Sequence, residues 1–548
     1  MLKALGLILA AVALAAQPHP PGPQVLTFWS NVDDSDQPYA VYVPKNFDAA
    51  KKYPLVVSLH GAYSNHRLNL RRVFGRGNPV SESDSAASRY FPPLPDVGFI
   101  VASPYARGTM GYQGIAEKDV YDVIADVKRR FPIDEERVYL TGLSMGGGGA
   151  LWLGLTRPDI WAALAPVCAA APDGTEVLAP NALNLPIHLF HGDADETVPV
   201  EVSRLWQKRF LDLGARAEYI EYPGIHHNSW DLAYKNGAIF EWFAPFHRTL
   251  HPDHVRFVST AYKYPSAYWL KLDGLTPGAA ASIDAQFAGP NRIEVTTSNL
   301  DGFTLNLAGH PKFSRATPVT VVIDGTVLKP KPGGALSFTR HGQEWIAAKF
   351  EPAAGDKHAG AEGPLAEAVA ARHIYVYGTG GSPDAEELRA RRGTAAEAAG
   401  WTGMAGHLAI SFQVKADKDV GDNDLESANL ILFGNKETNS IIARLSHDLP
   451  MELNVGAADY GLVFVAPFRG HHVLINSGLP WWTGADTVKW PKYQFLGPPA
   501  AVLENFGDYL LFKGSLDNIA AQGRFDRHWK LPQDAVARMQ ATGAVVIK

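Results

Sequence analysis

The feature that most constrains this chain is the run RVYLTGLSMGGGGALWLGL at residues 137–155. It begins as a β-rich segment, passes through the G-x-S-x-G sequence at residues 142–146, and continues as an apolar helix. A Cβ two positions before or after the serine would collide with the neighbouring strand or with the helix behind it. The run therefore predicts a tight strand-to-helix turn that lifts the Ser144 hydroxyl above a sheet. The alternative is a glycine-rich turn with an idle serine.

Two later segments supply the groups that would activate a serine. Residues 186–199, PIHLFHGDADETVP, and residues 219–230, YIEYPGIHHNSW, each predict a short strand followed by a polar loop. A histidine must take the serine proton, and a carboxylate must orient that histidine. Serine, acid and base in this chain order, each after a strand, predict a hydrolytic site on an α/β sheet. The residues alone leave two candidates for each role: Asp193 or Asp195, and His226 or His227.

These motifs resemble those of secreted α/β-hydrolases of the esterase and prolyl-oligopeptidase-like group. Feruloyl esterases, acetylxylan esterases and polyhydroxyalkanoate depolymerases share them. The family sequence H-G-x-x-D-x-x-V-P matches residues 191–199, and G-x-x-H-x-x-W matches residues 224–230. The resemblance covers about residues 24–248 and implies Asp195 as the acid and His227 as the base.

An oxyanion hole needs two backbone N–H groups aimed at the tetrahedral oxygen. One is expected from Met145, the residue after the serine. Residues 53–65, YPLVVSLHGAYSN, read as a buried strand that runs into His-Gly-Ala. This matches the family's H-G-x turn, so the resemblance implies the Ala62 N–H as the second donor. An ordinary β-to-α loop is the alternative.

Aromatic side chains near these motifs are candidates for substrate contact. Tyr63, Trp206 and Trp230, with Tyr105 beside them, could stack on a sugar or phenolic ring, unless they belong to the core. Residues 169–185 are too short for a full lid, so the connection at residues 63–95 is expected to cover part of the mouth.

Composition excludes several classes of function. The chain has 548 residues, 46% hydrophobic and 19% charged, and a net charge of −6, which argues against nucleic acid as a partner. Its one cysteine, Cys168, lies in an apolar stretch and is expected in the core. The sequence has no zinc-type cluster, phosphate loop or dinucleotide fingerprint, so neither a metal nor a cofactor is predicted.

The first residues are typical of a targeting segment. Lys3 precedes an apolar stretch that is too short to span a bilayer, and Ala13-Leu14-Ala15 offers a cleavage site. We predict a signal peptide over residues 1–16 and a secreted or periplasmic protein with no membrane span after cleavage.

The rest of the chain divides by its patterning. The fold class predicted is α/β, with an α/β-hydrolase fold over residues 17–250. Residues 251–350 alternate as short strands with Asp-Gly turns and predict a β-sandwich-like module. Residues 351–371 are a linker, and residues 372–548 predict a small α/β domain of unknown role. The Gly-rich turn at residues 378–381 lacks the spacing of a phosphate loop and is interpreted as a plain loop.

Together these features predict a secreted serine hydrolase that cleaves carboxylic esters through an acyl-enzyme. Polysaccharide-linked, aryl or short-chain esters are the expected substrates. A serine peptidase of the prolyl-oligopeptidase type is the alternative, and a non-catalytic binding protein on this scaffold is a third reading. Because every chemical motif lies before residue 250, residues 251–548 are expected to be accessory, and a chain ending near Pro252 is expected to hydrolyse small esters.

Overall fold

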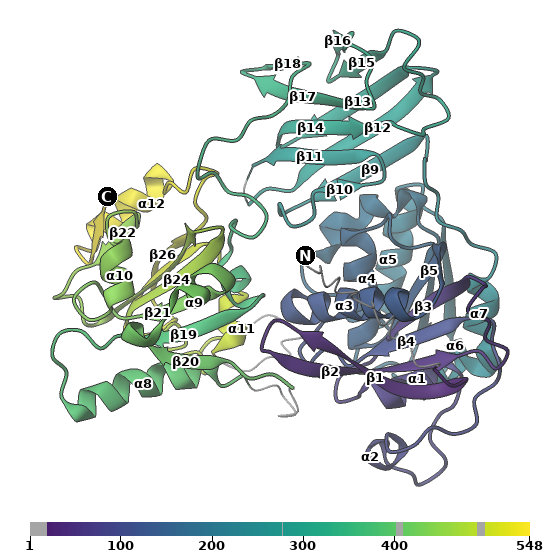
Figure 1. Ribbon diagram of the computed structural model, residues 1–548, viewed down its shortest axis with the longest axis horizontal. Helices are drawn as coiled ribbons and strands as arrows, with labels where there is room; N and C mark the ends of the chain where they lie inside the picture. The colour runs from purple at the N-terminus through teal and green to yellow at the C-terminus, as the bar shows by residue number, and fades with distance from the viewer. Residues whose placement is uncertain (1–18, 277, 402–408, 490–498) are drawn as a thin grey trace, which may run out of the picture.

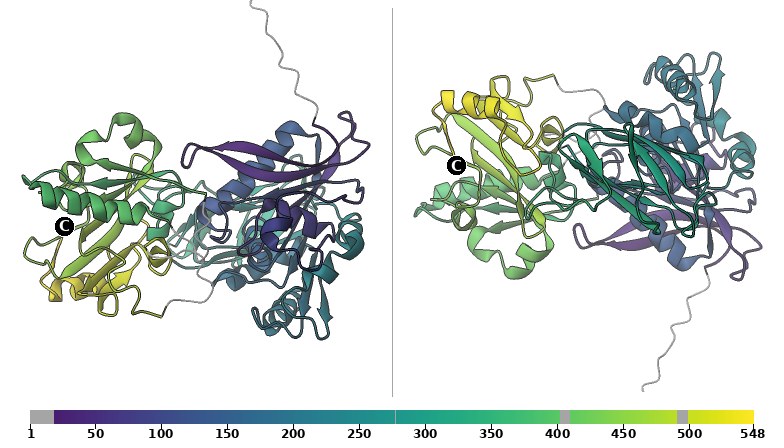
Figure 2. Two further views of the ribbon diagram at one scale, coloured as in Figure 1. Left: turned by 90° about the horizontal axis from the view of Figure 1, so that it is seen from below. Right: turned by 90° about the horizontal axis from the view of Figure 1, so that it is seen from above.

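The structure is a computed structural model that describes residues 19–276, 278–401, 409–489 and 499–548. The predicted signal peptide, residues 1–16, lies outside the described residues. Three regions follow one another along the chain, each with its own sheets, and all three meet near the centre of the molecule (Figures 1 and 2).

The first region contains an eight-stranded sheet in the order β1-β2-β4-β3-β5-β6-β7-β8. Strands β3 to β8 are parallel, and β1 and β2 form an antiparallel hairpin at one edge. The strands are β1 Gly22–Ser30, β2 Ser35–Val43, β3 Tyr53–Leu59, β4 Ile100–Pro104, β5 Ile133–Leu143, β6 Ala163–Val167, β7 Ile187–Gly192 and β8 Ala217–Tyr222.

Helices cover both faces of this sheet. They are α1 His66–Val73, α2 Asp84–Ala87, α3 Gly114–Arg130, α4 Met145–Thr156, α5 Glu201–Asp212, α6 Trp230–Ala233 and α7 Ala238–Phe243, with 3₁₀ segments η1 Thr175–Asn184 and η2 Lys235–Gly237. Leu55 and Val57 of β3 pack in the core beneath α3 and α4, whereas Val56 between them packs with α1 and α7. Every residue of β3 is buried, because a parallel strand covered on both faces has no solvent side.

The second region consists of two five-stranded sheets with one shared core. One sheet has the order β10-β11-β14-β17-β18 and the other β16-β15-β13-β12-β9. Their strands are β9 His254–Ser259, β10 Ser266–Ala267, β11 Leu270–Leu275, β12 Ala281–Gly289, β13 Arg292–Ser298, β14 Leu300–Asn306, β15 Thr320–Ile323, β16 Thr326–Leu328, β17 Ala335–His341 and β18 Glu344–Ile346.

The third region has a seven-stranded mixed sheet in the order β20-β19-β21-β24-β23-β25-β26 and a small two-stranded sheet, β22-β27. The strands are β19 His373–Tyr377, β20 Gln413–Ala416, β21 Asn429–Phe433, β22 Met451–Leu453, β23 Tyr460–Phe468, β24 His471–Gly478, β25 Tyr509–Lys513, β26 Ile519–Gly523 and β27 Val545–Ile547. The helices are η3 Leu365–Val369, α8 Ala385–Ala399, η4 Asp417–Asp419, α9 Asp422–Ser427, α10 Ser440–Leu445, α11 Ala500–Leu503 and α12 Gln533–Ala541.

The glycine-rich turn after β19 holds no open cradle. The Gly380 N–H donates to the Thr438 carbonyl at 2.8 Å, and a Cβ on Gly378 would lie 2.1 Å from the same oxygen. The next loop of the sheet therefore fills the place that a phosphate would need, in agreement with its interpretation as a plain loop.

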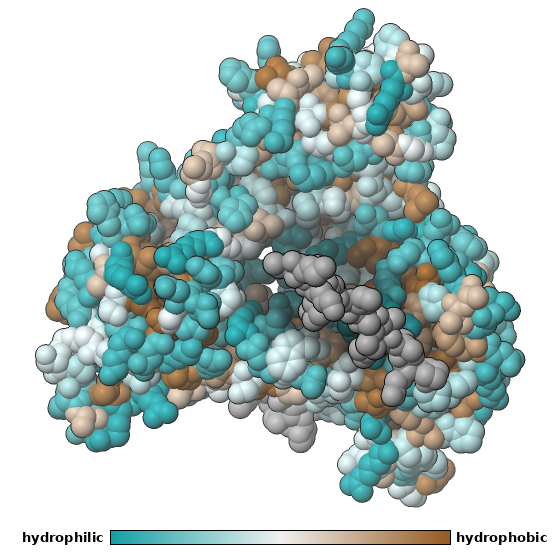
Figure 3. Space-filling view, in the orientation of Figure 1, coloured by the Kyte–Doolittle hydropathy of each residue, from teal (hydrophilic) through white to brown (hydrophobic). Residues whose placement is uncertain are grey.

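The regions are joined by buried contacts. Asn181 of η1 is 1% exposed, and its amide donates to the Val258 carbonyl at 2.9 Å and accepts from the Val258 N–H at 2.6 Å. Val258 and Ala501 belong to the core of the first region. A pocket of about 280 Å³ remains where the regions meet, lined among others by Trp152, Lys263 and Trp401. The space-filling view in Figure 3 shows a hollow at the centre of the face turned to the viewer.

Among the described residues, no helix is both long and apolar enough to cross a membrane.

Replacing Asn181 tests how firmly the second region is held. Asn181→Ala leaves the buried Val258 N–H and the Leu155 and Val258 carbonyls without this partner, so we expect a loss of about 1–3 kcal/mol in stability. Thermal unfolding measures it. Asn423→Ala, at an exposed position of α9, is the control and should change stability by less than about 0.5 kcal/mol. Equal melting temperatures for the two variants would contradict the expectation.

Candidate active site

The predicted strand-to-helix turn is present between β5 and α4. Strand β5 ends at Leu143, helix α4 begins at Met145, and Ser144 between them has φ 56° and ψ −118°. Its N–H donates to the Val167 carbonyl at 2.9 Å, and its carbonyl accepts from the Ala170 N–H at 3.1 Å. A non-glycine residue keeps a positive φ only when its surroundings hold it there, so β6 and the residues after it fix the direction of the serine.

The two glycines of the motif have the steric role that the sequence predicts. A Cβ on Gly142 would lie 2.2 Å from the Gly146 carbonyl oxygen. A Cβ on Gly146 would lie 2.3 Å from the carbonyl oxygen of Leu59 in β3. Neither position tolerates a side chain, since the obstacle in each case is backbone.

The loops after β7 and β8 complete a hydrogen-bonded chain with the serine. His227 Nε2 lies 2.9 Å from Ser144 Oγ, and His227 Nδ1 lies 2.7 Å from Asp195 Oδ2. A carboxylate only accepts, so Nδ1 carries the proton and Nε2 of the neutral ring accepts from the hydroxyl. The Asp195 side chain is fully buried, whereas that of His227 is 23% exposed. The side of this hydrogen-bonded set that faces Ser144 is therefore open to a substrate.

Asp195 is held as a carboxylate. Burial works to raise its pKa, but hydrogen bonds from His191, His227 and the Val198 N–H outweigh it and hold the pKa well below its usual range. The Thr197 and Val198 N–H groups both donate to Oδ1 at 2.9 Å. Asp195 therefore presents a fixed negative charge to the histidine.

His191, from the H-G motif, positions the acid. Its Nε2 faces two acceptors, Asp195 Oδ2 at 3.2 Å and the Val198 carbonyl at 3.0 Å, so this nitrogen carries the proton. Its Nδ1 then accepts from the Ser203 hydroxyl at 2.7 Å. The role of Ser203 was not foreseen, because nothing in the sequence ties a serine of α5 to this loop.

The neighbouring candidates lie elsewhere. Asp193 is exposed, and its carboxylate accepts from the Gly224 N–H at 2.6 Å, which ties the loop after β7 to the loop that carries His227. His226 is exposed. The geometry thus brings Asp195 and His227 to Ser144, the pair that the resemblance implied.

The turn after β3 lies beside the serine. A Cβ on Gly61 would be 3.5 Å from Ser144 Cβ, which places the Ala62 N–H next to the elbow. Within the described part of the chain, neither the Ala62 N–H nor the Met145 N–H donates to another residue. Both amides predicted as oxyanion donors therefore remain available to a ligand.

The predicted aromatic residues divide into two groups. Tyr63 is 58% exposed and follows Ala62, and the Trp230 ring lies 5.4 Å from the His227 ring in an edge-on contact. Trp206 is only 4% exposed and stacks on Phe210 within the core. The prediction of substrate contact by Trp206 is thus corrected, since the (i, i+4) pair of α5 faces inward.

Cys168 is buried as expected, and it lies close to Asp195 and His227. Its Sγ, a carboxylate oxygen of Asp195 and a ring nitrogen of His227 all lie within 4.8 Å of one another. Burial raises the pKa of the thiol to about 12, so the sulfur stays protonated. Its position after β6 was the available signal, because parallel strands end at a common edge.

Comparison with known proteins gives a family match within the first region. Residues 116–235 match the phospholipase/carboxylesterase family. The predicted resemblance to the esterase and prolyl-oligopeptidase-like group is thereby confirmed, as is the α/β-hydrolase fold of this region.

Solved structures with similar chains include esterases and a peptidase. A thermostable esterase is 26% identical, with 41% of this chain and 63% of that chain covered and a TM-score of 0.34. A ferulic acid esterase is 18% identical, with 42% and 99% covered and a TM-score of 0.32. A candidate dipeptidyl aminopeptidase IV from Bacteroides ovatus is 21% identical, with 41% and 36% covered and a TM-score of 0.33.

Paired substitutions test the choice of acid and base. We expect Asp195→Asn and His227→Ala to lower kcat about 10³-fold or more, since each disrupts the hydrogen bonds that link Asp195 through His227 to Ser144. The adjacent substitutions Asp193→Asn and His226→Ala should cost less than about tenfold. Steady-state kinetics on a short-chain aryl ester measure all four, and a reversed order within either pair would refute the assignment.

Proposed function

We propose that this chain is a serine hydrolase that cleaves carboxylic esters through an acyl-enzyme, with Ser144 as nucleophile, His227 as general base and Asp195 as its orienting acid. The observation that carries the proposal is the hydrogen-bonded chain from Ser144 Oγ through the His227 ring to Asp195. A serine hydroxyl needs such a partner to become nucleophilic at neutral pH.

In the first half-reaction, His227 Nε2 takes the Ser144 proton while Oγ attacks the ester carbonyl carbon. The carbonyl oxygen becomes an oxyanion, which the Ala62 and Met145 N–H groups stabilise. Asp195 stabilises the imidazolium without accepting its proton. The imidazolium then protonates the leaving alcohol, and Ser144 retains the acyl group.

In the second half-reaction, a water molecule replaces the alcohol. His227 takes a proton from this water, which attacks the acyl carbon, and the same two N–H groups stabilise the second oxyanion. Collapse of this intermediate returns the proton to Ser144 Oγ and releases the carboxylic acid.

A cavity next to the oxyanion turn supports a hydroxylated or aromatic substrate group. It has a volume of about 300 Å³ and is lined by Tyr63, Ser64, Asn65, Leu68, Asp84, Ser85, Ser88, Tyr105, Gly108 and Thr109. An exposed tyrosine and several hydroxyls in one cavity suit a sugar or phenolic ring. Polysaccharide-linked or aryl esters are therefore the substrates we propose.

Helix α2 forms one wall of this cavity and is held by the first helix of the region. Arg72 of α1 donates to both carboxylate oxygens of Asp84 at 3.0 and 3.1 Å, and its guanidinium lies 5.4 Å from the centre of the Trp230 ring. We propose that the connection between α1 and β4 covers part of the mouth, in place of a separate lid.

We extend the proposal to the organisation of the chain. The catalytic domain would end near residue 250, a β-sandwich domain near residue 350 and an α/β domain at the end of the chain, with export directed by residues 1–16. The first region's contacts with the rest of the chain make the second and third regions part of one folded unit.

Activity-based labelling and two substrates separate the readings. A fluorophosphonate probe should label Ser144, whereas a non-catalytic binding protein would stay unlabelled. Turnover of an aryl ester without turnover of a dipeptidyl anilide supports the esterase, and the reverse supports the peptidase. Acetylated xylan and feruloyl esters then define the acyl group.

Replacing the nucleophile gives the sharpest result. We expect Ser144→Ala to fold normally and to retain less than about one-thousandth of kcat, because the hydroxyl that forms the acyl-enzyme is removed. Circular dichroism provides the folding control. Retention of a tenth of the activity would remove Ser144 from its role.

The pH dependence of kcat/KM follows from the protonation of the proposed catalytic residues. Because the pKa of Asp195 is held well below its usual range, its carboxylate stays ionised throughout the assay range. The histidine base must be neutral to accept the serine proton, so its protonation at low pH stops the reaction. We expect kcat/KM to fall below about pH 6 with a one-proton slope. A midpoint below about pH 4.5 would instead indicate a carboxyl group as the base.

A further inference from the structure

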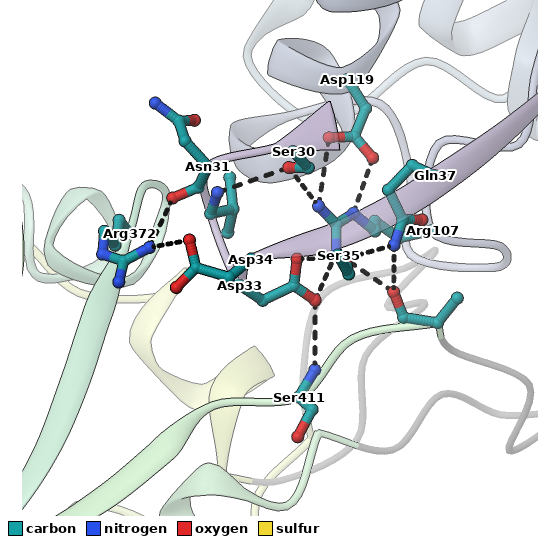
Figure 4. Close-up of polar contacts among 12 residues, drawn as sticks. Ser30, Asn31, Asp33, Asp34, Ser35, Gln37, Arg107, Asp119, Arg372 and Ser411 are labelled. Atoms are coloured by element: carbon teal, nitrogen blue, oxygen red, sulfur yellow. Dashed lines mark hydrogen bonds and ion pairs between the residues drawn. The ribbon is translucent and has the colours of Figure 1, made fainter. Parts of the chain in front are cut away.

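A buried guanidinium outside the active site connects distant parts of the chain (Figure 4). Arg107 follows β4 and is fully buried. Its Nε donates to Asp119 Oδ2 at 2.6 Å, its Nη2 to Ser30 Oγ at 2.6 Å and its Nη1 to Asp33 Oδ2 at 2.7 Å. A buried charge is stable only when its surroundings satisfy its donors, so the side chain is fixed in this position.

The third region completes this set of partners. Arg107 Nη1 also donates to the Ala409 carbonyl at 3.1 Å, and the Arg107 carbonyl accepts from the Ala409 N–H at 3.3 Å. The Ser411 N–H lies 3.4 Å from Asp33 Oδ2, the oxygen that already holds the guanidinium (Figure 4). Residues 409–411 therefore dock directly on the loop after β4.

A second contact closes the same junction nearer the surface. Arg372, just before β19, donates to Asp34 Oδ1 at 2.7 Å and to the Asn31 carbonyl at 3.1 Å. Both partners belong to the turn between β1 and β2 (Figure 4). The side chains of Arg372 and Asp34 are 27% and 45% exposed, so this contact can be altered without opening the core.

The loop that carries Arg107 also braces the turn beside Ser144. The Tyr105 carbonyl lies 2.9 Å from His60 Nε2, and Thr109 Oγ1 accepts from the Tyr63 N–H at 2.8 Å. Tyr112 donates its hydroxyl to the His60 carbonyl at 3.0 Å. Residues 105–112 thus hold the residues on both sides of the Gly61-Ala62 turn.

The loop keeps a conformation that its own residues do not favour. Ala106 has φ 45° and Arg107 has φ 65°, the left-handed region in which a Cβ is strained. Such a pair persists only when surrounding contacts hold it. Two of those contacts come from Ala409, about three hundred positions later in the sequence.

We propose that the docking of residues 409–411 on Arg107 sets the position of the Ala62 N–H, so that the third region acts as a built-in activator of the site and Arg107 is a positioning residue. The inference rests on the proposed function, because it assigns an effect on oxyanion binding. Loss of docking leaves the triad intact and lets residues 105–112 and 60–63 relax, which lowers kcat more than it changes KM.

The test uses the full chain with one surface substitution. Arg372→Glu places like charges at Asp34 and weakens docking. Lys436→Glu is the matched control, since it likewise replaces the cation of an ion pair by an anion, here opposite Glu452 at 2.8 Å within the third region. Hydrogen–deuterium exchange should rise in residues 105–112 and 60–66 for Arg372→Glu and stay at the wild-type level for Lys436→Glu.

Kinetics on a small aryl ester provide the second readout. We expect Arg372→Glu to lower kcat about five- to twentyfold with KM within about twofold, less than the 10²–10³ that loss of an oxyanion donor costs. Arg372→Lys, which keeps a cation near Asp34, should restore most of the loss. A merely structural role would lower the melting temperature without this division between kcat and KM.

Two results would overturn the inference. One is faster exchange confined to residues 31–37 and 409–413 with unchanged kcat. The other is unchanged exchange at residues 409–413 in a double variant that adds Ala409→Pro and so removes the N–H that reaches Arg107. Fluorophosphonate labelling of the wild-type chain keeps the two hypotheses apart: an unlabelled Ser144 rejects the proposed function, whereas the exchange result still decides whether the third region braces the turn.

Discussion

The close approach of helix α4 to strand β3 and to the segment after β6 is the constraint on which the site depends. A Cβ on Gly146 would lie 2.3 Å from the Leu59 carbonyl oxygen, and one on Gly148 would lie 1.9 Å from the Ala170 carbonyl oxygen. Any side chain at either position would push α4 outward. Ser144 would then lose its positive φ, and its Oγ would no longer lie 2.9 Å from His227 Nε2. Backbone packing thus decides the direction of the Ser144 side chain, and the hydrogen bonds of that side chain follow from it.

The sequence predicts well the local geometry that depends only on the residues of a short motif. The glycines around Ser144 predict a tight turn, because the steric limits that require them involve nearby backbone. The structure contains that turn. The loops after β7 and β8 follow from strand patterning, since parallel strands bring their carboxyl ends to one edge. The choice of Asp195 over Asp193 needed the family resemblance, because the two lie in one loop and only the three-dimensional path shows that Asp193 binds the Gly224 N–H instead.

What the sequence does not reveal are side-chain environments that depend on distant segments. Trp206 looked like a candidate for substrate contact, yet it packs inward on Phe210 because α5 buries that face. Arg107 gave no signal at all, since its partners come from the turn between β1 and β2, from α3 and from a loop of the third region. A buried guanidinium can be recognised only when all of its acceptors are in place. The expectation that residues 251–548 are accessory is based on motifs alone and does not include their contacts with the first region.

Helix α3 shows why the three regions form one unit around the serine. Glu117 and Asp119 are both almost fully buried, and residues two apart on a helix point in different directions. Asp119 binds Arg107, whose carbonyl and guanidinium meet the third region. Glu117 accepts from Trp152 of α4 at 3.1 Å and from the Tyr264 hydroxyl of the second region at 2.6 Å. One helix thus anchors the second region to the helix that begins after Ser144, and the third region to the loop that contacts both sides of the Gly61-Ala62 turn. Removing the second region would take the Tyr264 hydroxyl from the buried Glu117 carboxylate. Removing the third region would take the Ala409 carbonyl from the buried Arg107 guanidinium that Asp119 holds, so either loss would reach the elements around Ser144 through α3.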